Sequence, residues 1–226
     1  DLIQKVYEGT LRKKEAELKA LQAQINPHFL YNTLDIAYWT AKMERASQTS
    51  EMIDSLSQFF RHALIMDDDF TTVGNEIEHL RYYIILKRQG KTSFDFELDY
   101  EEETLGCRVV KLVLQPLVEN AILHGISGIK DGKVEVNIFR DGETLKYEVK
   151  DNGAGIDVDD MNQLLEHVET NNRGLGIKNM NNRIKLACGD GYGLSFYDRE
   201  GKGAVITVTQ PFNPAVQTCS DTGRDI

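Results

Sequence analysis

The spacing of the apolar residues changes near Gly90 and Lys91, and this change constrains the fold more than any other feature of the sequence. Before it, apolar residues recur every three or four positions, which is typical of helices that bury one face. After it, residues 94–100 alternate between apolar and polar side chains, as a half-buried strand does. The sequence therefore predicts an α+β protein with a helical region, a mixed region and a flexible tail: 1–91, 92–212 and 213–226.

Three helices are expected in the first region. The longest covers residues 2–46, and its apolar residues at three-, four- and seven-residue spacing form a seam like that of a coiled coil: Leu11, Leu18, Leu21 and Ile25. Pro27 should kink this helix, because proline lacks an amide donor and clashes with the preceding turn. Two shorter helices are predicted over 50–66 and 73–88. Together the three form a bundle or hairpin that a second copy of the chain completes.

The second region combines strands and helices. Residues 134–138 and 145–149 alternate around Asp141 and Gly142, a dipeptide that is favoured in tight hairpins. The remaining elements are two helices and a last hairpin: 110–123, 176–187, 193–197 and 204–209. This order predicts a two-layer α/β sandwich.

The composition excludes several classes of function. Acidic residues outnumber basic ones, 36 to 26, so the net charge of -10 disfavours nucleic acid and anionic membranes as partners. The three cysteines form no C-x-x-C pair and are too few for a disulfide framework, which suits a cytoplasmic setting. No apolar run reaches the ~18 to 20 residues that span a bilayer. Because the chain begins at Asp1 within a helical pattern, we expect a fragment of a longer protein.

Asp151 ends a predicted strand and leads into Asn152-Gly153-Ala154-Gly155. Glycines in such a turn adopt left-handed backbone and let a flat ligand approach the main chain. A carboxylate at the start of the turn can accept a hydrogen bond from an amine, and adenine carries one. The motif therefore points to base selection by Asp151, although an ordinary turn explains the same residues when they are taken alone.

Glu119 and Asn120 are polar residues on a helix whose other side is apolar. An amide oxygen suits Mg²⁺, which takes a few protein oxygens together with phosphates and water. Asn120 is therefore a candidate metal ligand, and Glu119 a candidate for orienting a metal-bound water or accepting a proton. A solvent-facing polar pair is the simpler alternative.

Gly174 and Gly176 precede a predicted helix. The unpaired amides and the dipole at the start of a helix bind anions such as phosphate, and Lys178 would add positive charge. The preceding residues 157–173 form either a lid over a nucleotide or an ordinary surface loop.

His28 lies in a polar stretch that interrupts a helix with periodic apolar residues. Neutral imidazole is a nucleophile, and histidine populates that form near neutral pH. Asn32 follows one helical turn later, so it shares a face with His28 and can hydrogen-bond the ring or an attacking water. A lone histidine is more often structural, and that interpretation applies to the other four: His62, His79, His124 and His167.

Four segments, in this order, resemble those of sensor histidine kinases of the LytS and YesM kind: 24–34, 114–125, 151–156 and 174–179. The resemblance covers residues 15–212. The catalytic half of that family belongs to the GHKL superfamily of gyrase, Hsp chaperone, histidine kinase and MutL ATPases, so a GHKL (Bergerat) fold that binds ATP and Mg²⁺ is expected for the second region.

The resemblance implies that His28 accepts the phosphoryl group, Asn120 binds Mg²⁺ and Asp151 reads the adenine. Glu119 would tune the metal and its water, and Asn32 would assist His28. The other nucleotide-binding residues that it implies are Gly153, Gly155, Gly174, Gly176, Lys178, Asn179 and Thr207. The expected protein is a homodimer that passes the phosphoryl group to the receiver domain of a response regulator. It would be attached to the inner or plasma membrane only through a preceding sensor region.

Two positions depart from the family pattern. Phe29 follows His28 where the wider group of histidine kinases has an acidic residue, and Ala204 follows Gly203 where relatives often have threonine. Two other functions fit parts of the sequence. One is an ATP-driven conformational module like the chaperone and topoisomerase relatives, and the other is a silent dimerisation and docking module.

Overall fold

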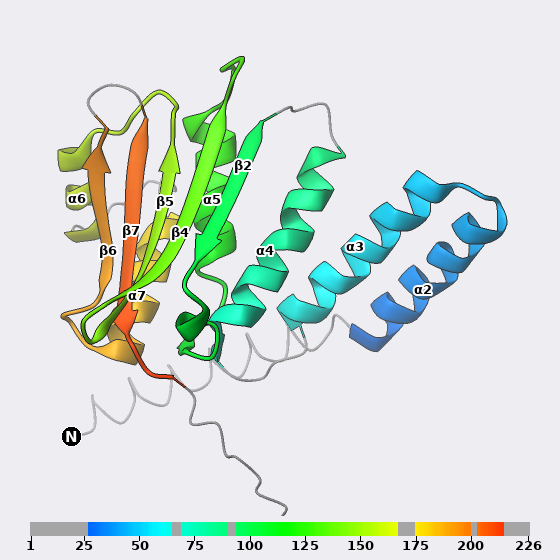
Figure 1. Ribbon diagram of the computed structural model, residues 1–226, viewed down its shortest axis with the longest axis horizontal. Coiled ribbons are helices and arrows are strands. Elements are labelled where there is room, and N and C mark those ends of the chain that lie inside the picture. The colour runs from blue at the N-terminus through cyan, green and yellow to red at the C-terminus, as the bar shows by residue number, and fades with distance from the viewer. Residues whose placement is uncertain (1–26, 65–68, 90–93, 167–174, 200–202, 215–226) are drawn as a thin grey trace, which may run out of the picture. The chain divides into compact units, whose positions relative to one another are not determined.

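The computed structural model describes residues 27–64, 69–89, 94–166, 175–199 and 203–214. The chain divides into two compact units between Ile65 and Met66, and helices α2 and α3 lie in the first (Figure 1). This division differs from the boundary that the change of periodicity predicts at residues 91 and 92. The third helix, α4 (Val73–Arg88), belongs to the second unit because it packs on helix α5 (Leu114–Asn120).

The first unit is a helical hairpin of α2 (Pro27–Met43) and α3 (Ser47–Leu64). The chain turns between them with Arg45 in the left-handed region, at a φ of 57°, so the first helix ends before the predicted Ala46. The Tyr31 hydroxyl donates to the Phe60 carbonyl oxygen at 3.2 Å and ties the two helices together. The predicted coiled-coil seam lies outside the described residues. The predicted kink at Pro27 also lies outside them, because the described part of the helix starts at this residue.

The second unit begins with a small antiparallel sheet of β1 (Phe70–Thr72) and β3 (Arg108–Val110), which the sequence patterns did not predict. The helix predicted over 73–88 is confirmed as α4, and Thr72 caps it by accepting a hydrogen bond from the amide of Asn75.

The main sheet has five strands in the order β2-β4-β5-β7-β6. Strands β2 and β4 are parallel, and the other neighbours are antiparallel. The bounds are β2 Asp95–Tyr100, β4 Lys133–Asp141, β5 Thr144–Asp151, β6 Gly193–Asp198 and β7 Ala204–Pro211. Both predicted hairpins are therefore confirmed. A short 3₁₀ helix, η1 (Glu102–Thr104), follows β2.

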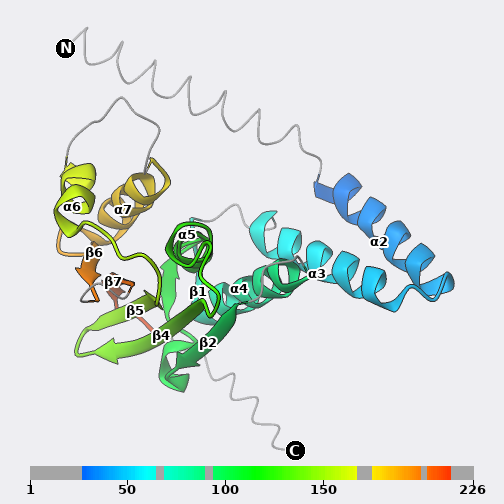
Figure 2. The same ribbon diagram turned by 90° about the horizontal axis from the view of Figure 1, so that it is seen from above.

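Helices α5, α6 (Val158–Glu166) and α7 (Leu175–Cys188) lie on one side of this sheet (Figure 2). Alternate strand residues point toward the helices and form the core, and they include Val134, Val136, Ile138, Leu145, Tyr147, Val149, Ile206 and Val208. The intervening residues are mostly polar and face away from the helices. The predicted α+β class with a two-layer sandwich is confirmed.

The helix predicted over 110–123 is wrong at its start and its end. Strand β3 runs to Val110, and Leu112 then adopts a φ of 55°, so helix α5 starts only at Leu114. At the other end the α-helix stops at Asn120 and continues as one π-helical turn, η2 (Ala121–Gly125). Apolar periodicity did not reveal these changes, because the buried residues of β3, the turn and α5 form one continuous apolar pattern.

Order also continues past the predicted domain end at residue 212. The carbonyl oxygen of Asn213 accepts a hydrogen bond from the amide of Arg108 at 3.0 Å, and Pro214 pairs with Cys107. The rest of the predicted flexible tail lies outside the described residues. In the described part of the chain, no helix is both long and apolar enough to cross a membrane.

Candidate functional site

Asp151 ends strand β5 and is only 5% exposed. Its Oδ1 accepts hydrogen bonds from the amides of Gly153 at 2.8 Å and Ala204 at 3.3 Å. Burial raises the pKa of this carboxyl, while the two amides act in the opposite direction. Oδ1 accepts both of these hydrogen bonds. Among the described residues no such bond reaches Oδ2, so this second oxygen can still accept one.

Three glycines surround Asp151 and leave no room for a side chain. A Cβ atom on Gly125 would lie 2.8 Å from Asp151 Cγ, and one on Gly153 would overlap the Gly125 carbonyl oxygen. A Cβ on Gly203 would overlap the main chain of Asp151. The sequence indicated Gly153, but the structural need for Gly125 and Gly203 is visible only in the fold.

The loop after Asp151 is held by its neighbours. Asn152 accepts a hydrogen bond from the amide of Lys133 at 2.7 Å and donates one to the Asp131 carbonyl oxygen at 2.8 Å. Gly155 has a φ of 80°, which only glycine adopts without strain, so its conformation agrees with the sequence interpretation. The loop is therefore a fixed platform beside the buried carboxylate.

Glu119 and Asn120 occupy the end of α5, and both are half-buried. The π turn η2 carries the chain from Asn120 to Gly125, whose carbonyl oxygen accepts a hydrogen bond from the amide of Ala154 at 3.1 Å. π-Helical turns are frequent at functional sites. The fold thus brings α5 and the Asp151 loop together, as the sequence interpretation requires.

Helix α7 supplies the predicted residues that follow Gly174, which itself lies outside the described residues. Gly176 is exposed, and a Cβ atom there would meet nothing within 4 Å. Lys178 is half-buried and Asn179 is exposed. The Arg183 guanidinium donates to the Lys111 carbonyl oxygen at 2.7 Å and so joins α7 to the chain before α5. The first turn of α7 therefore belongs to the same side of the sheet as Asp151.

The segment predicted as a lid or a surface loop, 157–173, contains helix α6. Its start is stabilised by Asp157, whose Oδ1 accepts hydrogen bonds from the amides of Asp159 and Asp160 at 3.0 and 3.1 Å. This helix was not predicted, although an aspartate cap before a short amphipathic stretch could have indicated it. The remaining part of the segment lies outside the described residues.

Thr207 is not part of the site that contains Asp151. In the sheet register Thr207 pairs with Glu148, and Ala204 lies three residues earlier on the same strand. Because side chains alternate along a strand, Thr207 faces the side opposite Asp151, whereas Ala204 faces the same side. The assignment of Thr207 as a nucleotide ligand is therefore wrong.

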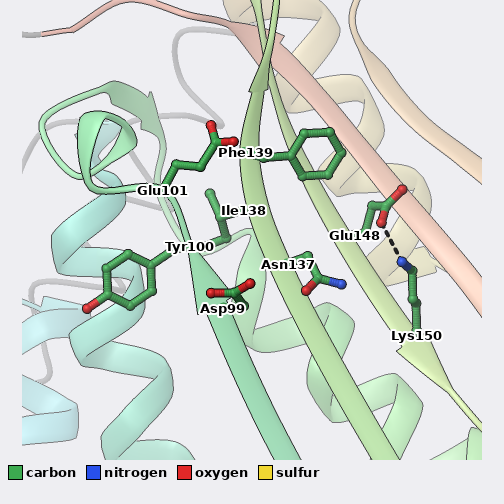
Figure 3. A pocket seen from close by; sticks show the side chains of 8 residues that line it. All are labelled: Asp99, Tyr100, Glu101, Asn137, Ile138, Phe139, Glu148 and Lys150. Carbon is green, nitrogen blue, oxygen red and sulfur yellow. Dashed lines mark ion pairs between the residues drawn. The ribbon is translucent and has the colours of Figure 1, made fainter.

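A hollow of about 310 Å³ lies on the polar face of the sheet (Figure 3). The register of β5 and β7 places Thr207 on the same face. The lining residues of the hollow come from β2, from Glu101 just after it, and from β4 and β5. Glu148 forms an ion pair there with Lys150 at 2.6 Å. Strand alternation places this hollow on the side away from Asp151, so it is not the nucleotide site.

His28 and Asn32 lie on α2 in the first unit, and both are exposed. The Asn32 amide nitrogen is 3.3 Å from His28 Nδ1, so the predicted one-turn pairing is present. Phe29, beside His28, is 71% exposed. The acceptor candidate is thus open to a reacting partner.

In the described residues, no three histidine, cysteine, aspartate or glutamate side chains gather closely enough to hold a metal ion. A magnesium ion at Asn120 fits this finding, since Mg²⁺ with a nucleotide takes most of its ligands from phosphates and water.

Two family models match the chain. Residues 16–91 match "Histidine kinase", and residues 108–214 match "Histidine kinase-, DNA gyrase B-, and HSP90-like ATPase". The chain is 37% identical to the sensor histidine kinase YesM of Bacillus subtilis over 213 residues, which are 93% of this chain and 36% of YesM. It is 32% identical to BtsS of Escherichia coli, with 88% of this chain and 34% of BtsS covered.

The fold has solved counterparts. The catalytic domain of the histidine kinase ThkA superposes with a TM-score of 0.51 at 20% identity, and the match covers 66% of this chain and all of that domain (100%). At this identity the likeness concerns the fold alone. The chain spans about a third of the length of the curated relatives that it matches, such as YesM (36%) and BtsS (34%).

Proposed function

Because the chain belongs to the sensor histidine kinases of the LytS and YesM kind, with a GHKL ATPase unit, we propose that it phosphorylates His28 with ATP. His28 then passes the phosphoryl group to an aspartate in the receiver domain of a response regulator. The observation that carries this proposal is the presence in one chain of an exposed histidine and a buried carboxylate enclosed by glycines.

The buried carboxylate of Asp151 is proposed to accept the adenine amine through Oδ2. Gly153 and Gly155 leave space for the flat base beside the main chain, since they carry no side chains. The first turn of α7 would face the phosphates, because the start of a helix attracts anions, and the residues assigned there are Gly174, Gly176, Lys178 and Asn179. The arrangement separates base recognition on the Asp151 loop from phosphate binding on α7.

Asn120 is proposed to bind Mg²⁺ through its amide oxygen, with Glu119 orienting a metal-bound water. Bound Mg²⁺ would neutralise the phosphate charge that develops during transfer. The half-buried position of both side chains at the end of α5, next to the π turn that reaches Gly125, supports this assignment.

The chemical step moves one phosphoryl group. A lone pair of the neutral His28 ring attacks the γ-phosphorus, and a nitrogen–phosphorus bond forms as the bond to the bridging oxygen breaks. ADP leaves with that electron pair. The other ring nitrogen gives its proton to water, which reaches this exposed side chain. Positioning and charge neutralisation supply most of the rate.

Asn32 is proposed to select the reactive tautomer of His28. Its amide lies 3.3 Å from Nδ1, and an amide can be turned so that its oxygen or its nitrogen faces the ring. With the oxygen facing Nδ1, Asn32 accepts a hydrogen bond from the Nδ1 N–H group until that proton passes to water, and the lone pair of Nε2 stays available for the attack.

The active form is proposed to be a homodimer formed through α2. Four large apolar side chains on this helix are between 63% and 77% exposed: Phe29, Ile36, Trp39 and Met43. Three of them are seven residues apart, which is the repeat of a coiled-coil seam. A second copy of α2 would cover this stripe.

We place the chain in the cytoplasm as part of a membrane-bound sensor. The family relationship supports this placement, since response regulators act in the cytoplasm. The net charge of -10 supports a protein partner rather than nucleic acid.

Incubation with γ-labelled ATP and Mg²⁺ tests the proposal. The protein should acquire an acid-labile, alkali-stable label that His28→Ala abolishes. His62→Ala, on α3 of the same unit, is the matched control and should keep the label. Release of free phosphate without protein label would favour the ATP-driven module, and neither product would favour the silent docking module.

A second experiment tests the adenine assignment. Asp151→Asn should weaken ATP binding by about 10- to 100-fold, because a hydrogen bond from a ligand to a buried charged group is lost. Asp99→Asn changes an exposed aspartate on the opposite face of the sheet and should bind ATP normally. Unchanged affinity in Asp151→Asn would refute the assignment.

A further inference from the structure

Helix α4 holds the start of α5 through a buried carboxylate. Glu76 is 3% exposed, and it accepts hydrogen bonds from the amides of Leu112, Val113 and Leu114 at 2.7, 2.8 and 3.0 Å. The N-cap residue of α5, Val113, makes no side-chain capping bond, so Glu76 takes over this role from another helix. Burial raises the pKa of Glu76, while these amides act in the opposite direction. The position of α5 is therefore tied to α4.

The same face of α4 continues toward Glu119. One turn after Glu76, His79 Nε2 lies 3.3 Å from Gln115 Oε1. Gln115 Nε2 in turn lies 3.2 Å from Glu119 Oε2. His79, Gln115 and Glu119 thus form a continuous chain of hydrogen bonds from α4 to the end of α5.

Glu119 determines which groups donate and which accept in this series of hydrogen bonds. An ionised carboxylate only accepts hydrogen bonds, so Gln115 must present its NH₂ group to Glu119. The Gln115 oxygen then faces His79, and His79 must carry a proton on Nε2 to donate to it. Each group in the chain has one assigned role.

We propose that α4 is a positioning element for phosphoryl transfer, in which His79, acting through Gln115, fixes the orientation of the Glu119 carboxylate. This inference rests on the proposed function, which places Glu119 beside Mg²⁺ and its water. His79 and Gln115 are positioning residues, because they act through Glu119. Adenine binding depends on Asp151, so loosening Glu119 slows the transfer more than it weakens the binding of ATP.

The test compares Gln115→Met with the unaltered chain. This variant should transfer phosphate to His28 about tenfold more slowly at saturating ATP, because small misplacements of a catalytic group are costly. Its affinity for a non-hydrolysable ATP analogue should stay within about twofold. If Gln115→Met and the unaltered chain transferred phosphate at equal rates, the inference would be overturned and the proposed function would stand. A lack of label on the unaltered chain would overturn the proposed function and the inference with it.

Two control variants separate positioning from folding. Gln210→Met removes a buried glutamine whose Oε1 accepts from the amide of Val110 at 2.8 Å, away from Glu119 in the sequence and in its contacts. Tyr147→Phe removes a buried hydroxyl that has no hydrogen-bond partner among the described residues. Both should keep the transfer rate per folded molecule. If Gln115→Met behaved like Gln210→Met, with lower stability and an unchanged rate, the role would be purely structural and the inference overturned.

A spectroscopic measurement tests the hydrogen-bond chain without any activity. In ¹⁵N-labelled protein the ring-nitrogen shifts of His79 should report the tautomer with its proton on Nε2. Gln115→Met should change these shifts, because the acceptor is lost. A His79 ring with its proton only on Nδ1 would overturn the proposed chain.

Discussion

The two units of this molecule place their reactive groups in opposite surroundings. In the α2–α3 hairpin, His28 is exposed and lies beside exposed apolar residues. In the second unit, Asp151 is buried, and three glycines enclose it. The proposed function accounts for this difference. A phosphate acceptor must be accessible to two partners, whereas a carboxylate that binds a base gains from surroundings of low dielectric constant.

The two units also differ in how much of their apolar surface is buried, and this affects their stability. The second unit has a continuous core between its sheet and helices, so it can hold buried charges such as Glu76 in fixed hydrogen bonds. The hairpin leaves its largest apolar side chains on the surface, and few of its residues are fully buried. We therefore expect substitutions in the second unit to act on folding and ATP binding, and those in the hairpin to act on dimerisation and phosphate acceptance.

The largest expected effect is that of Gly153→Ala. The new Cβ atom would lie 2.7 Å from Asp151 Oδ1 and would overlap the Gly125 carbonyl oxygen, so the loop must move. ATP binding, measured by calorimetry, should fall by about 100-fold or more, while dimerisation persists. Gly106→Ala is the control, because a Cβ atom there meets nothing within 4 Å. Normal ATP binding by Gly153→Ala would contradict this account of the site.

The Ile36→Glu variant tests the other unit, the α2–α3 hairpin. A charge on the exposed stripe of α2 would be buried on dimerisation, so the dimer should weaken by about 2 to 3 kcal/mol. Analytical ultracentrifugation measures this change, and ATP affinity should not alter. Thr49→Glu adds a charge at an exposed position of α3 and serves as the control. A dimer of undiminished strength would show that α2 is not the interface.

Glu76→Gln should lower the free energy of unfolding by about 2 kcal/mol, since an amide replaces a charged cap that accepts three hydrogen bonds. Urea denaturation followed by circular dichroism gives the value. Glu78→Gln, on the exposed side of α4, should change stability little. Equal stability of the two variants would mean that the cap contributes nothing.

A smaller effect concerns pH. The pKa of Asp151 is raised by burial, so its carboxyl is protonated more readily in the folded than in the unfolded chain. The stability that this difference contributes is complete below about pH 4, the usual range of an unfolded aspartate, and is lost as pH rises through the folded pKa. The stability of the unaltered chain relative to Asp151→Asn should therefore decrease with rising pH. Urea titrations of both chains at several pH values measure it, and a constant difference would argue against the raised pKa.

The sequence predicted the regular elements well where one physical signal was dominant. Helix α4 and both hairpins were found from periodicity and from the Asp141-Gly142 turn. Strands β1 and β3 were missed, because three-residue strands show no alternation that a single sequence can reveal. The error at Thr207 arose differently. Its distance from Asp151 along the chain does not tell which face of the sheet it occupies, and only the register of β5 and β7 does.

By itself, the sequence determined the class of the fold, because apolar periodicity is a local property. The roles proposed for His28, Asn120, Asp151 and the loop glycines also come from local motifs, and they stay predictions. Only the tertiary structure decided which of these groups meet and what holds them. The enclosure of Asp151 by Gly125 and Gly203, and the contacts from α4 to Glu119, join residues far apart in the chain. Such contacts depend on the packing of whole elements, so no local pattern encodes them.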